Sequence, residues 1–242
     1  MKRRALIIYM TDTPSGRLDG PAYDYKNIHE YLTSNLGGNW YSNEIIALQN
    51  ATKRQLKEAI FRMADSDYAF VVFSGHGEFE QDTKLQYIEL LDDEVSIKEL
   101  FVNSKRQTII IDACRGYFSM RERLLEKSKV FSMASESLYH EISTRELFNN
   151  KLAKTEEGLT ILYAANENQT ALDTNIGAAY ISSLLNIAKK WELSSNNMEE
   201  LTIKDAHEKA IDYLYLNFDT KQIPVINKEK RLRYYPFAVK YS

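Results

Sequence analysis

Two residues that could form a nucleophilic pair each follow an apolar stretch of the sequence. Cys114, the only cysteine among 242 residues, comes shortly after the apolar run 109–111, and His76 stands between two glycines after the run 69–73. A thiol attacks carbonyl carbons well once a base has removed its proton, and histidine is the side chain that most often acts as that base. These residue types therefore predict a cysteine nucleophile with a histidine base, if the fold brings the two together.

The placement of the pair favours this interpretation over a structural one. A lone cysteine is most often a small buried apolar residue, and a histidine between glycines can simply occupy a turn. However, both stretches have the composition of buried strands, and ligands of open α/β sheets bind beyond the carboxyl ends of the strands. If the two strands are parallel neighbours, His76 and Cys114 meet at that edge of the sheet.

The rest of the sequence alternates between strand and helix patterns, which is typical of a mainly parallel sheet covered by helices on both faces. Strands are expected over 5–10, 44–48, 69–74, 109–114 and 159–164, with a short strand or hairpin over 85–91 and a last edge strand over 233–239. Helices are expected over 23–36, 178–191 and 204–216, with a helical turn over 96–101. Thr52 is expected to cap a further helix, with Gln55 as its capping-box partner.

Composition excludes several classes of function. The formal net charge of −3 provides no basic field for nucleic acid or for an anionic membrane. The apolar runs are far shorter than the roughly 18 residues that a spanning helix needs. The polar turn at 11–14 ends the first apolar stretch too early for a secretory signal. One cysteine cannot form an intrachain disulfide, so we expect a reducing, cytoplasmic location.

The segment 117–158 interrupts the alternation of strands and helices. A connection of this length is too long for a passive loop between adjacent strands. Two interpretations stay open, an additional helical excursion and a flexible functional loop.

Residues 74–77 (Ser-Gly-His-Gly) and 112–116 (Asp-Ala-Cys-Arg-Gly) resemble the two signature motifs of the caspase and metacaspase superfamily, the clan CD cysteine endopeptidases. Three further segments are similar to metacaspase segments, at 18–24, 92–94 and 164–173. The resemblance extends over nearly the whole chain. It is closest to prokaryotic caspase-like proteases with a metacaspase-type pocket.

This resemblance implies a single peptidase domain over 1–242 with the caspase-like three-layer sandwich, in which a sheet of about six strands lies between helices. Residues 1–116 would correspond to the large subunit of that family and 159–242 to the small subunit. The segment 117–158 would then be the linker or an insertion.

The resemblance also implies a mechanism. Cys114 would attack the scissile carbonyl with help from His76, and water would hydrolyse the resulting acyl-enzyme. The backbone amides of Gly77 and Cys114 would form the oxyanion hole. The remaining histidines are expected at the surface: His29, His140 and His207.

Substrate preference is predicted by acidic residues near the pair. Asp24, Ser74 and Asp112 match the positions that line the metacaspase pocket, and Asp173 is a further candidate at its rim. Carboxylates at the base of a pocket favour a cationic side chain, which predicts cleavage after Arg or Lys. Asp112 could instead cap local amides at the end of its strand. Arg115 argues in the other direction, because the Arg-Gly ending is caspase-like.

Calcium activates many metacaspases, and Asp92 and Asp93 resemble part of the carboxylate cluster that binds it. However, the stretch between His76 and Asp92 is short, and Arg121 stands where another acidic ligand would be expected. A solvated acidic turn is the favoured interpretation, so the expected enzyme requires no cofactor.

The expected partners are a protein or peptide substrate and an activating partner protein or ligand, with no nucleic acid and no membrane. Self-cleavage in the linker is a second possible control, because the segment offers seven basic residues: Arg121, Arg123, Lys127, Lys129, Arg145, Lys151 and Lys154. Two alternatives stay open: the same protease with caspase-type specificity for Asp, and a catalytically silent binding module on the same fold. The intact His76 and Cys114 argue against the silent module.

Overall fold

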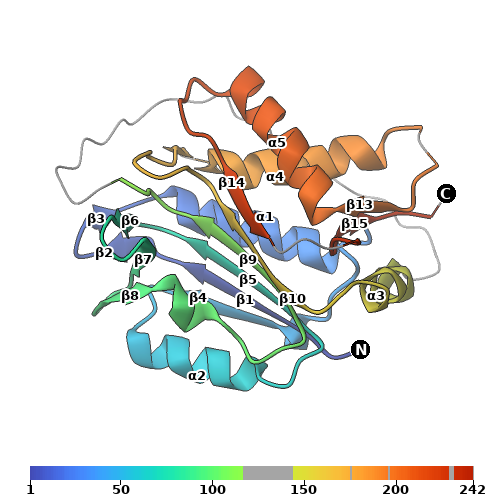
Figure 1. Cartoon of the computed structure of the whole chain (residues 1–242), viewed down its shortest axis with the longest axis horizontal. Coiled ribbons are helices and arrows are strands. Elements are labelled where there is room, and N and C mark those ends of the chain that lie inside the picture. The colour runs from blue at the N-terminus through green and yellow to red at the C-terminus, as the bar shows by residue number, and fades with distance from the viewer. Residues whose placement is uncertain (117–143, 175, 196, 229–231, 242) are drawn as a thin grey trace.

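Six strands form the central sheet of the molecule (Figure 1). The computed structural model describes residues 1–116, 144–174, 176–195, 197–228 and 232–241. The strands of the central sheet are β1 (Arg3–Tyr9), β4 (Ile45–Gln49), β5 (Tyr68–Ser74), β9 (Arg106–Asp112), β10 (Gly158–Tyr163) and β14 (Val225–Lys228). They lie in the order β14-β10-β9-β5-β1-β4, and β14 alone in this sheet runs antiparallel to its neighbour. The predicted mainly parallel sheet is confirmed.

Alternate residues of the strands face opposite layers of helices. In β1, Ala5 and Ile7 contribute to one core, and Leu6 and Ile8 contribute to the other. The first core lies beneath α1 (Gly20–Thr33), α4 (Ala179–Glu192) and α5 (Ile203–Asn217), and the second lies beneath α2 (Lys53–Met63) and the 3-10 helix η2 (Ile97–Leu100). The strands are apolar on both faces because both faces are covered. Within the described residues, no helix has both the length and the apolar character needed to cross a bilayer.

Small antiparallel sheets lie at the two ends of the central sheet. They are formed by β2 (Asp12–Thr13) with β3 (Gly16–Arg17), β6 (Gly77–Glu80) with β7 (Leu85–Glu89) and β8 (Glu94–Ser96), β11 (Asp173–Thr174) with β12 (Gly177–Ala178), and β13 (Glu200–Thr202) with β15 (Pro236–Val239). Figure 1 shows β2, β3, β6, β7 and β8 at the end where β1 and β5 finish. β13 and β15 lie at the opposite end, near α3 (Thr144–Ala153). The first end is therefore the one that holds the predicted catalytic residues.

Most predicted elements are confirmed, with bounds that move by a few residues. The capping box is present as expected, since the Thr52 hydroxyl accepts a hydrogen bond from the Gln55 amide and the Gln55 side chain accepts one from the Thr52 amide. The helix expected over 23–36 begins at Gly20 and ends at Thr33. The 3-10 helix η1 (Ser42–Glu44) was not predicted.

The last edge-type strand expected over 233–239 is present, but it is shorter and lies outside the central sheet. Residues Pro236–Val239 form β15, which pairs with β13 beyond the end of the central sheet. The edge position is taken by β14, which pairs with residues 160–163 of β10. β14 has only four residues and little apolar periodicity, so its pairing depends on tertiary packing that the sequence pattern does not express.

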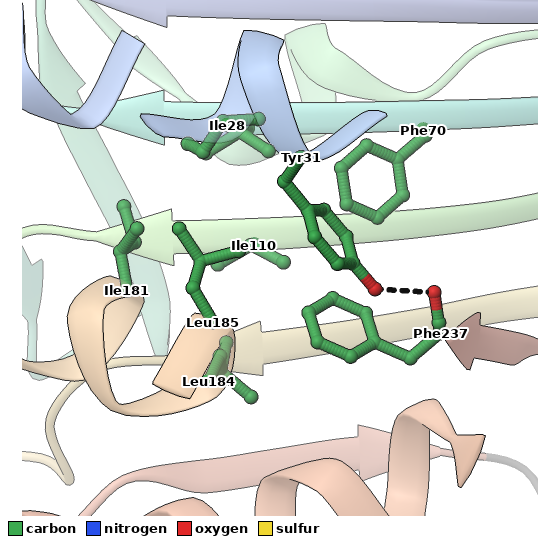
Figure 2. A pocket seen from close by; sticks show the side chains of 9 residues that line it. Ile28, Tyr31, Phe70, Ile110, Ile181, Leu184, Leu185 and Phe237 are labelled. Atoms are coloured by element: carbon green, nitrogen blue, oxygen red, sulfur yellow. Dashed lines mark hydrogen bonds between the residues drawn. The ribbon is translucent and has the colours of Figure 1, made fainter. Parts of the chain in front are cut away.

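The layer beneath α1 and α4 is closely packed (Figure 2). Tyr31 of α1 points between Phe70 and Phe237, and its hydroxyl donates a hydrogen bond to the carbonyl of Phe237. The apolar cavity beside these rings has a volume of about 10 Å³. That volume is at the lower limit for a single water, and the lining is apolar, so the cavity is a small packing gap in the core and no ligand site.

Helix α3 is fixed to the main body immediately after the part of the linker that lies outside the described residues. Phe148 and Leu152 are buried in the core, and the Phe148 ring contacts the ring of Trp40. Arg145 makes two hydrogen bonds to the carboxylate of Glu44, of 2.7 and 2.6 Å. The end of the 117–158 segment is thus a docked helix. The predictions for 117–143, including the positions of Arg121 and His140, concern residues outside the described part of the chain.

His207 was expected at the surface, and this prediction is wrong. The residue is 2% exposed in the face of α5 that packs against α4, and its Nδ1 lies 2.6 Å from the hydroxyl oxygen of Tyr180. The spacing of Ile203, Ala206, His207 and Ala210 is that of a buried helix stripe, which places His207 inside. His29 is half-buried on α1.

The docking of α3 predicts that Phe148→Ala strongly destabilises the protein. Removing a buried aromatic side chain leaves a cavity and costs about 3–5 kcal/mol of unfolding free energy. Phe61→Ala is the matched control, because Phe61 on α2 is 82% exposed and its loss should cost less than about 0.5 kcal/mol. Urea unfolding of both variants measures the difference. Equal losses would contradict the described packing of α3.

Candidate active site

The pairing of β5 with β9 places the predicted catalytic residues at one edge of the sheet. Ser74, the last residue of β5, is the register partner of Asp112, the last residue of β9. The Gly75 amide donates a hydrogen bond of 3.1 Å to the Asp112 carbonyl just beyond this pair. His76 comes two residues after Ser74, and Cys114 comes two residues after Asp112. Both residues are half-buried. The two strands are parallel neighbours, as the sequence pattern required.

Two backbone amides near Cys114 bear on the predicted oxyanion hole, those of Gly77 and Cys114. The Phe79 amide points away from β7 and donates a hydrogen bond of 3.1 Å to the carbonyl of Gly116. Gly77 lies two residues earlier on the same strand, so its amide points to the same side, towards the loop that contains Cys114. Among the described residues, the Cys114 amide donates no hydrogen bond. The Gly77 amide is therefore directed towards the loop that contains the thiol, and the Cys114 amide has no other acceptor among the described residues.

Gly77 must be a glycine for this arrangement to form. A Cβ atom at this position would lie 2.7 Å from the Tyr87 carbonyl oxygen and 2.9 Å from the Cβ of Ala113, the neighbour of Cys114. Contacts this short do not occur, so any side chain would move β6 away from the nucleophile loop. The close approach of the two segments brings the Gly77 amide near Cys114.

Three carboxyl groups from three different elements, those of Asp24, Asp112 and Asp173, lie close enough to influence one another at the strand end that leads to Cys114. Asp24 of α1 is fully buried, accepting hydrogen bonds of 2.6 Å from the Ser74 hydroxyl and 2.9 Å from the Ala178 amide. Asp112 is 4% exposed and accepts a bond of 3.3 Å from the Ile181 amide. Pocket and capping roles are both predicted for Asp112, and its carboxylate lies at the first turn of α4.

Asp173 is the third carboxyl and differs from the other two. Its residue is partly exposed, yet its Oδ1 atom is buried and makes no hydrogen bond. Gly20 allows this position, because a Cβ there would lie 1.7 Å from Oδ1 of Asp173. The backbone amides of Gly20 and Thr174 lie close enough to this carboxyl to lower its pKa, against the larger effect of burial.

Burial without a nearby cation raises the pKa of each of these three carboxyl groups. Burial raises the pKa of Asp24 to about 7, against the lowering effect of the Ser74 and Ala178 hydrogen bonds. Burial, with the nearby charges of Asp24 and Asp173, raises the pKa of Asp112 well above its usual range. Burial also raises the pKa of Asp173 to about 6. Among the described residues that influence these three pKa values, none is a lysine or an arginine.

Cys114 is a protonated thiol at rest. Its Sγ lies 3.8 Å from the carbonyl oxygen of Ala171, and burial raises the pKa of the thiol, as do the charges of Asp112 and Asp173. A thiol of this kind needs a base at the moment of attack. His76 stands at the same edge of the sheet and is the histidine that can serve.

Arg115 turns away from the three carboxyl groups. Its guanidinium lies 4.7 Å from the ring centre of Phe79 and 4.3 Å from that of Tyr163, and its Nε donates a hydrogen bond to Gln86. The side chain is buried among these groups. Arg115 therefore supports the nucleophile loop from behind and leaves the pocket acidic.

The residues considered for calcium have other partners. Asp92 accepts a hydrogen bond of 2.8 Å from the Lys53 amide at the start of α2, and Asp93 forms an ion pair of 2.7 Å with the Lys53 side chain. Both are exposed. Within the described residues, no group of three or more His, Cys, Asp or Glu side chains is arranged to hold a metal.

Two buried polar residues near the site were not identified from the sequence. Glu89 accepts hydrogen bonds from Thr13 and Ser15, which hold the β2–β3 hairpin at this edge. Gln86 contacts the backbone of Cys114 directly. Both stand in a short strand where a polar residue normally indicates the solvent face, so no sequence signal marked them.

Comparisons with known proteins agree with this architecture. A family model described as the caspase domain matches residues 2–235. The crystal structure of caspase-1 from Spodoptera frugiperda is similar to this chain with a TM-score of 0.61, covering 93% of this chain and 88% of that chain, at 13% sequence identity. Likeness at this identity concerns the fold alone. No curated protein in the comparison matches the chain in sequence.

The raised pKa of Asp24 predicts a pH-dependent cost to stability. Between its unfolded pKa of about 3.9 and its folded pKa of about 7, only the unfolded state releases the proton, so stability falls as the pH rises through this window. Asp24→Asn should therefore gain in Tm relative to the wild type by at least about 2 °C between pH 5 and pH 8.

Thermal melts at the two pH values check this prediction, with Asp212→Asn as the control. Asp212 is exposed on α5, away from the acidic cluster, and its replacement should change Tm equally at both pH values. A Tm difference for Asp24→Asn that is the same at pH 5 and pH 8 would contradict the prediction.

Proposed function

Because the chain belongs to the caspase-domain family of cysteine-type endopeptidases, we propose that it cleaves peptide bonds after Arg or Lys. In this proposal Cys114 is the nucleophile, His76 is its base, and Asp24, Ser74, Asp112 and Asp173 form the pocket for the substrate side chain. The observation that supports the specificity is the cluster of three carboxyl groups beside Cys114 without a cationic partner among the described residues.

The reaction follows from the placement of the groups. His76 takes the proton of the Cys114 thiol as Sγ forms a bond to the scissile carbonyl carbon, and the carbonyl π electrons move to its oxygen. The amides of Gly77 and Cys114 stabilise that oxyanion. When the C–N bond breaks, His76 gives its proton to the leaving amine. Water then hydrolyses the thioester through the same steps and restores the thiol.

Electrostatics support a cationic substrate side chain. Bringing Arg or Lys into the cluster provides the missing countercharge and lets the carboxyl groups ionise with charge-assisted hydrogen bonds. Asp173 is the group best placed for the first such bond, because it is partly exposed whereas Asp24 and Asp112 are buried. An Asp side chain would instead add a fourth acid to the cluster. The orientation of Arg115 away from the carboxyl groups removes the feature that favoured the caspase-type alternative.

The remaining features of the proposal concern organisation and control. We propose one peptidase domain over 1–242, with a large-subunit-like part at 1–116, a linker at 117–158 and a small-subunit-like part at 159–242. The chemistry needs no cofactor, and the lone thiol suits a reducing compartment such as the cytoplasm. Control is assigned to self-cleavage of the linker or to an activating partner protein or ligand.

A panel of fluorogenic peptides with Arg, Lys or Asp at the cleaved position tests this proposal. We expect cleavage after Arg and Lys, no cleavage after Asp, no dependence on added calcium, and complete loss of activity in Cys114→Ala.

Asp173→Asn keeps the size of the side chain but removes the charge, which should raise the KM for Arg peptides about 10- to 100-fold, the loss expected for one charge-assisted hydrogen bond. Cleavage after Asp but not after Arg would reject the pocket assignment. A wild type without activity on any peptide, in a chain whose Cys114 is reactive, would favour the silent binding module.

Self-cleavage is predicted to occur within 117–143. Of the seven basic candidates, Arg145 and Lys151 lie in α3 and form ion pairs with Glu44 and Glu199. Lys154 directly follows α3, and its amide still donates a hydrogen bond of 3.1 Å to the Lys151 carbonyl. Proteases need an extended chain, so the expected cuts follow one of the four residues before α3: Arg121, Arg123, Lys127 or Lys129. Because α3 and β10 are buried against the rest of the fold, the two fragments should remain together.

Incubation of the purified protein, intact-mass measurement and size-exclusion chromatography check this prediction. The wild type should give two co-eluting fragments, while Cys114→Ala and a variant with all four residues changed to Gln should stay intact. A cut after Arg145, or an intact wild-type chain under conditions in which peptides are cleaved, would contradict it.

A further inference from the structure

We propose that Gln86 is a positioning residue for the nucleophile. Its carboxamide fixes the peptide bond that follows Cys114 and so restrains the Cys114 backbone, which carries both the amide and the thiol. This inference rests on the proposed function of Cys114, and the experiment below distinguishes a failure of the one from a failure of the other.

The carboxamide of Gln86 has well-defined partners. Its Nε2 donates hydrogen bonds of 2.9 Å to the Cys114 carbonyl and 3.1 Å to the Tyr87 carbonyl, and its Oε1 accepts one of 3.0 Å from Nε of Arg115. A guanidinium can only donate and a carbonyl can only accept, so this network permits one orientation of the amide. Gln86 is 1% exposed, and a buried amide that lost these bonds would be costly. The side chain is therefore held rigidly against the loop.

The peptide between Cys114 and Arg115 is held from both sides. Gln86 binds its carbonyl oxygen, and its N–H donates a hydrogen bond of 2.8 Å to the carbonyl of Gln169. The next carbonyl, that of Arg115, accepts a bond of 2.9 Å from the Asn168 amide. The plane of this peptide cannot rotate unless bonds on both sides break. Since it adjoins Cys114, its orientation fixes the backbone torsion that aims the Cys114 side chain.

Gln86 also links the two amides of the proposed oxyanion hole. A Cβ atom built at Gly77 would lie 3.0 Å from Nε2 of Gln86, so the carboxamide lies directly between the Gly77 backbone and the Cys114 carbonyl. The register of β6 and β7 sets Phe79 opposite Gln86 and Gly77 opposite Ile88. One short hairpin therefore holds both Gly77 and the residue that clamps Cys114, and it keeps their separation constant.

A purely structural role for Gln86 makes a different prediction from a positioning role. If the residue only completes the core, its replacement lowers the stability of the fold, and the molecules that remain folded keep the wild-type kcat. If it positions the nucleophile, a folded variant loses kcat while KM is retained, because the substrate side chain binds elsewhere in the pocket.

Gln86→Glu separates the hydrogen bond with Arg115 from the hydrogen bond to the Cys114 carbonyl. The carboxylate has the same shape and still accepts from Arg115, but it has no proton to donate to the Cys114 carbonyl. Gln107→Glu is the matched control, because Gln107 is also buried and also bonds backbone groups, those of Leu100 and Val102, at the distant end of β9. Gln86→Asn, which keeps the amide but shortens its reach, provides the same test if Gln86→Glu does not fold.

The measurements are kcat and KM for an Arg peptide, the inhibition constant of a peptide aldehyde ending in Arg, and the rate of Cys114 alkylation by iodoacetamide. An aldehyde forms a tetrahedral adduct that needs the oxyanion hole, whereas alkylation does not. For Gln86→Asn and Gln86→Glu we expect kcat to fall at least about tenfold with KM within about twofold, and the aldehyde to bind at least about tenfold more weakly. The neutral Gln86→Asn should be alkylated within about twofold of the wild-type rate, and Gln107→Glu should retain kcat and aldehyde affinity.

Wild-type kcat and aldehyde affinity in a folded Gln86 variant would overturn the proposal. An equal loss of kcat in Gln107→Glu would also overturn it, since the effect would then follow from stability alone. By contrast, activity that persists in Cys114→Ala would reject the proposed function itself, whatever the Gln86 variants do.

Discussion

The parallel pairing of β5 with β9 is the constraint on which the rest of the site depends. Because Ser74 and Asp112 are register partners, the residues that follow them leave the sheet at the same height and from adjacent strands. A slip of one residue would turn every apolar side chain of β9 to the opposite face. The two cores, one beneath α1 and α4 and the other beneath α2, both resist that slip. Core packing thereby positions the candidate catalytic residues.

The acidic cluster connects the stability of the fold to its proposed specificity. Asp24 and Asp112 accept hydrogen bonds from Ala178 and Ile181 at the start of α4, a helix whose own N-cap residue provides no side-chain bond. These carboxyl groups therefore cap a helix and also make the pocket acidic. Burying them without a countercharge costs stability near neutral pH. A cationic substrate side chain would offset that cost, which couples binding to ionisation of the pocket.

The nucleophile loop is shared between distant parts of the chain. β6 and β7 provide Phe79 and Gln86, and the segment after β10 provides Asn168, Gln169 and the Ala171 carbonyl near the thiol. The second group follows the 117–158 segment in sequence, so the loop is complete only when both halves of the fold are assembled.

The sequence by itself determined the mainly parallel sheet, the order of most strands and helices, and the placement of His76 and Cys114 after two buried strands, because apolar runs and caps are local signals. It also indicated Asp24, Ser74, Asp112 and Asp173, although their roles remain predictions. Only the tertiary structure decided that β14 and not β15 completes the sheet, that Arg115 packs against Phe79 and Tyr163, and that Gln86 holds the Cys114 carbonyl. Each of these depends on contacts between residues far apart in the chain, which no local pattern records.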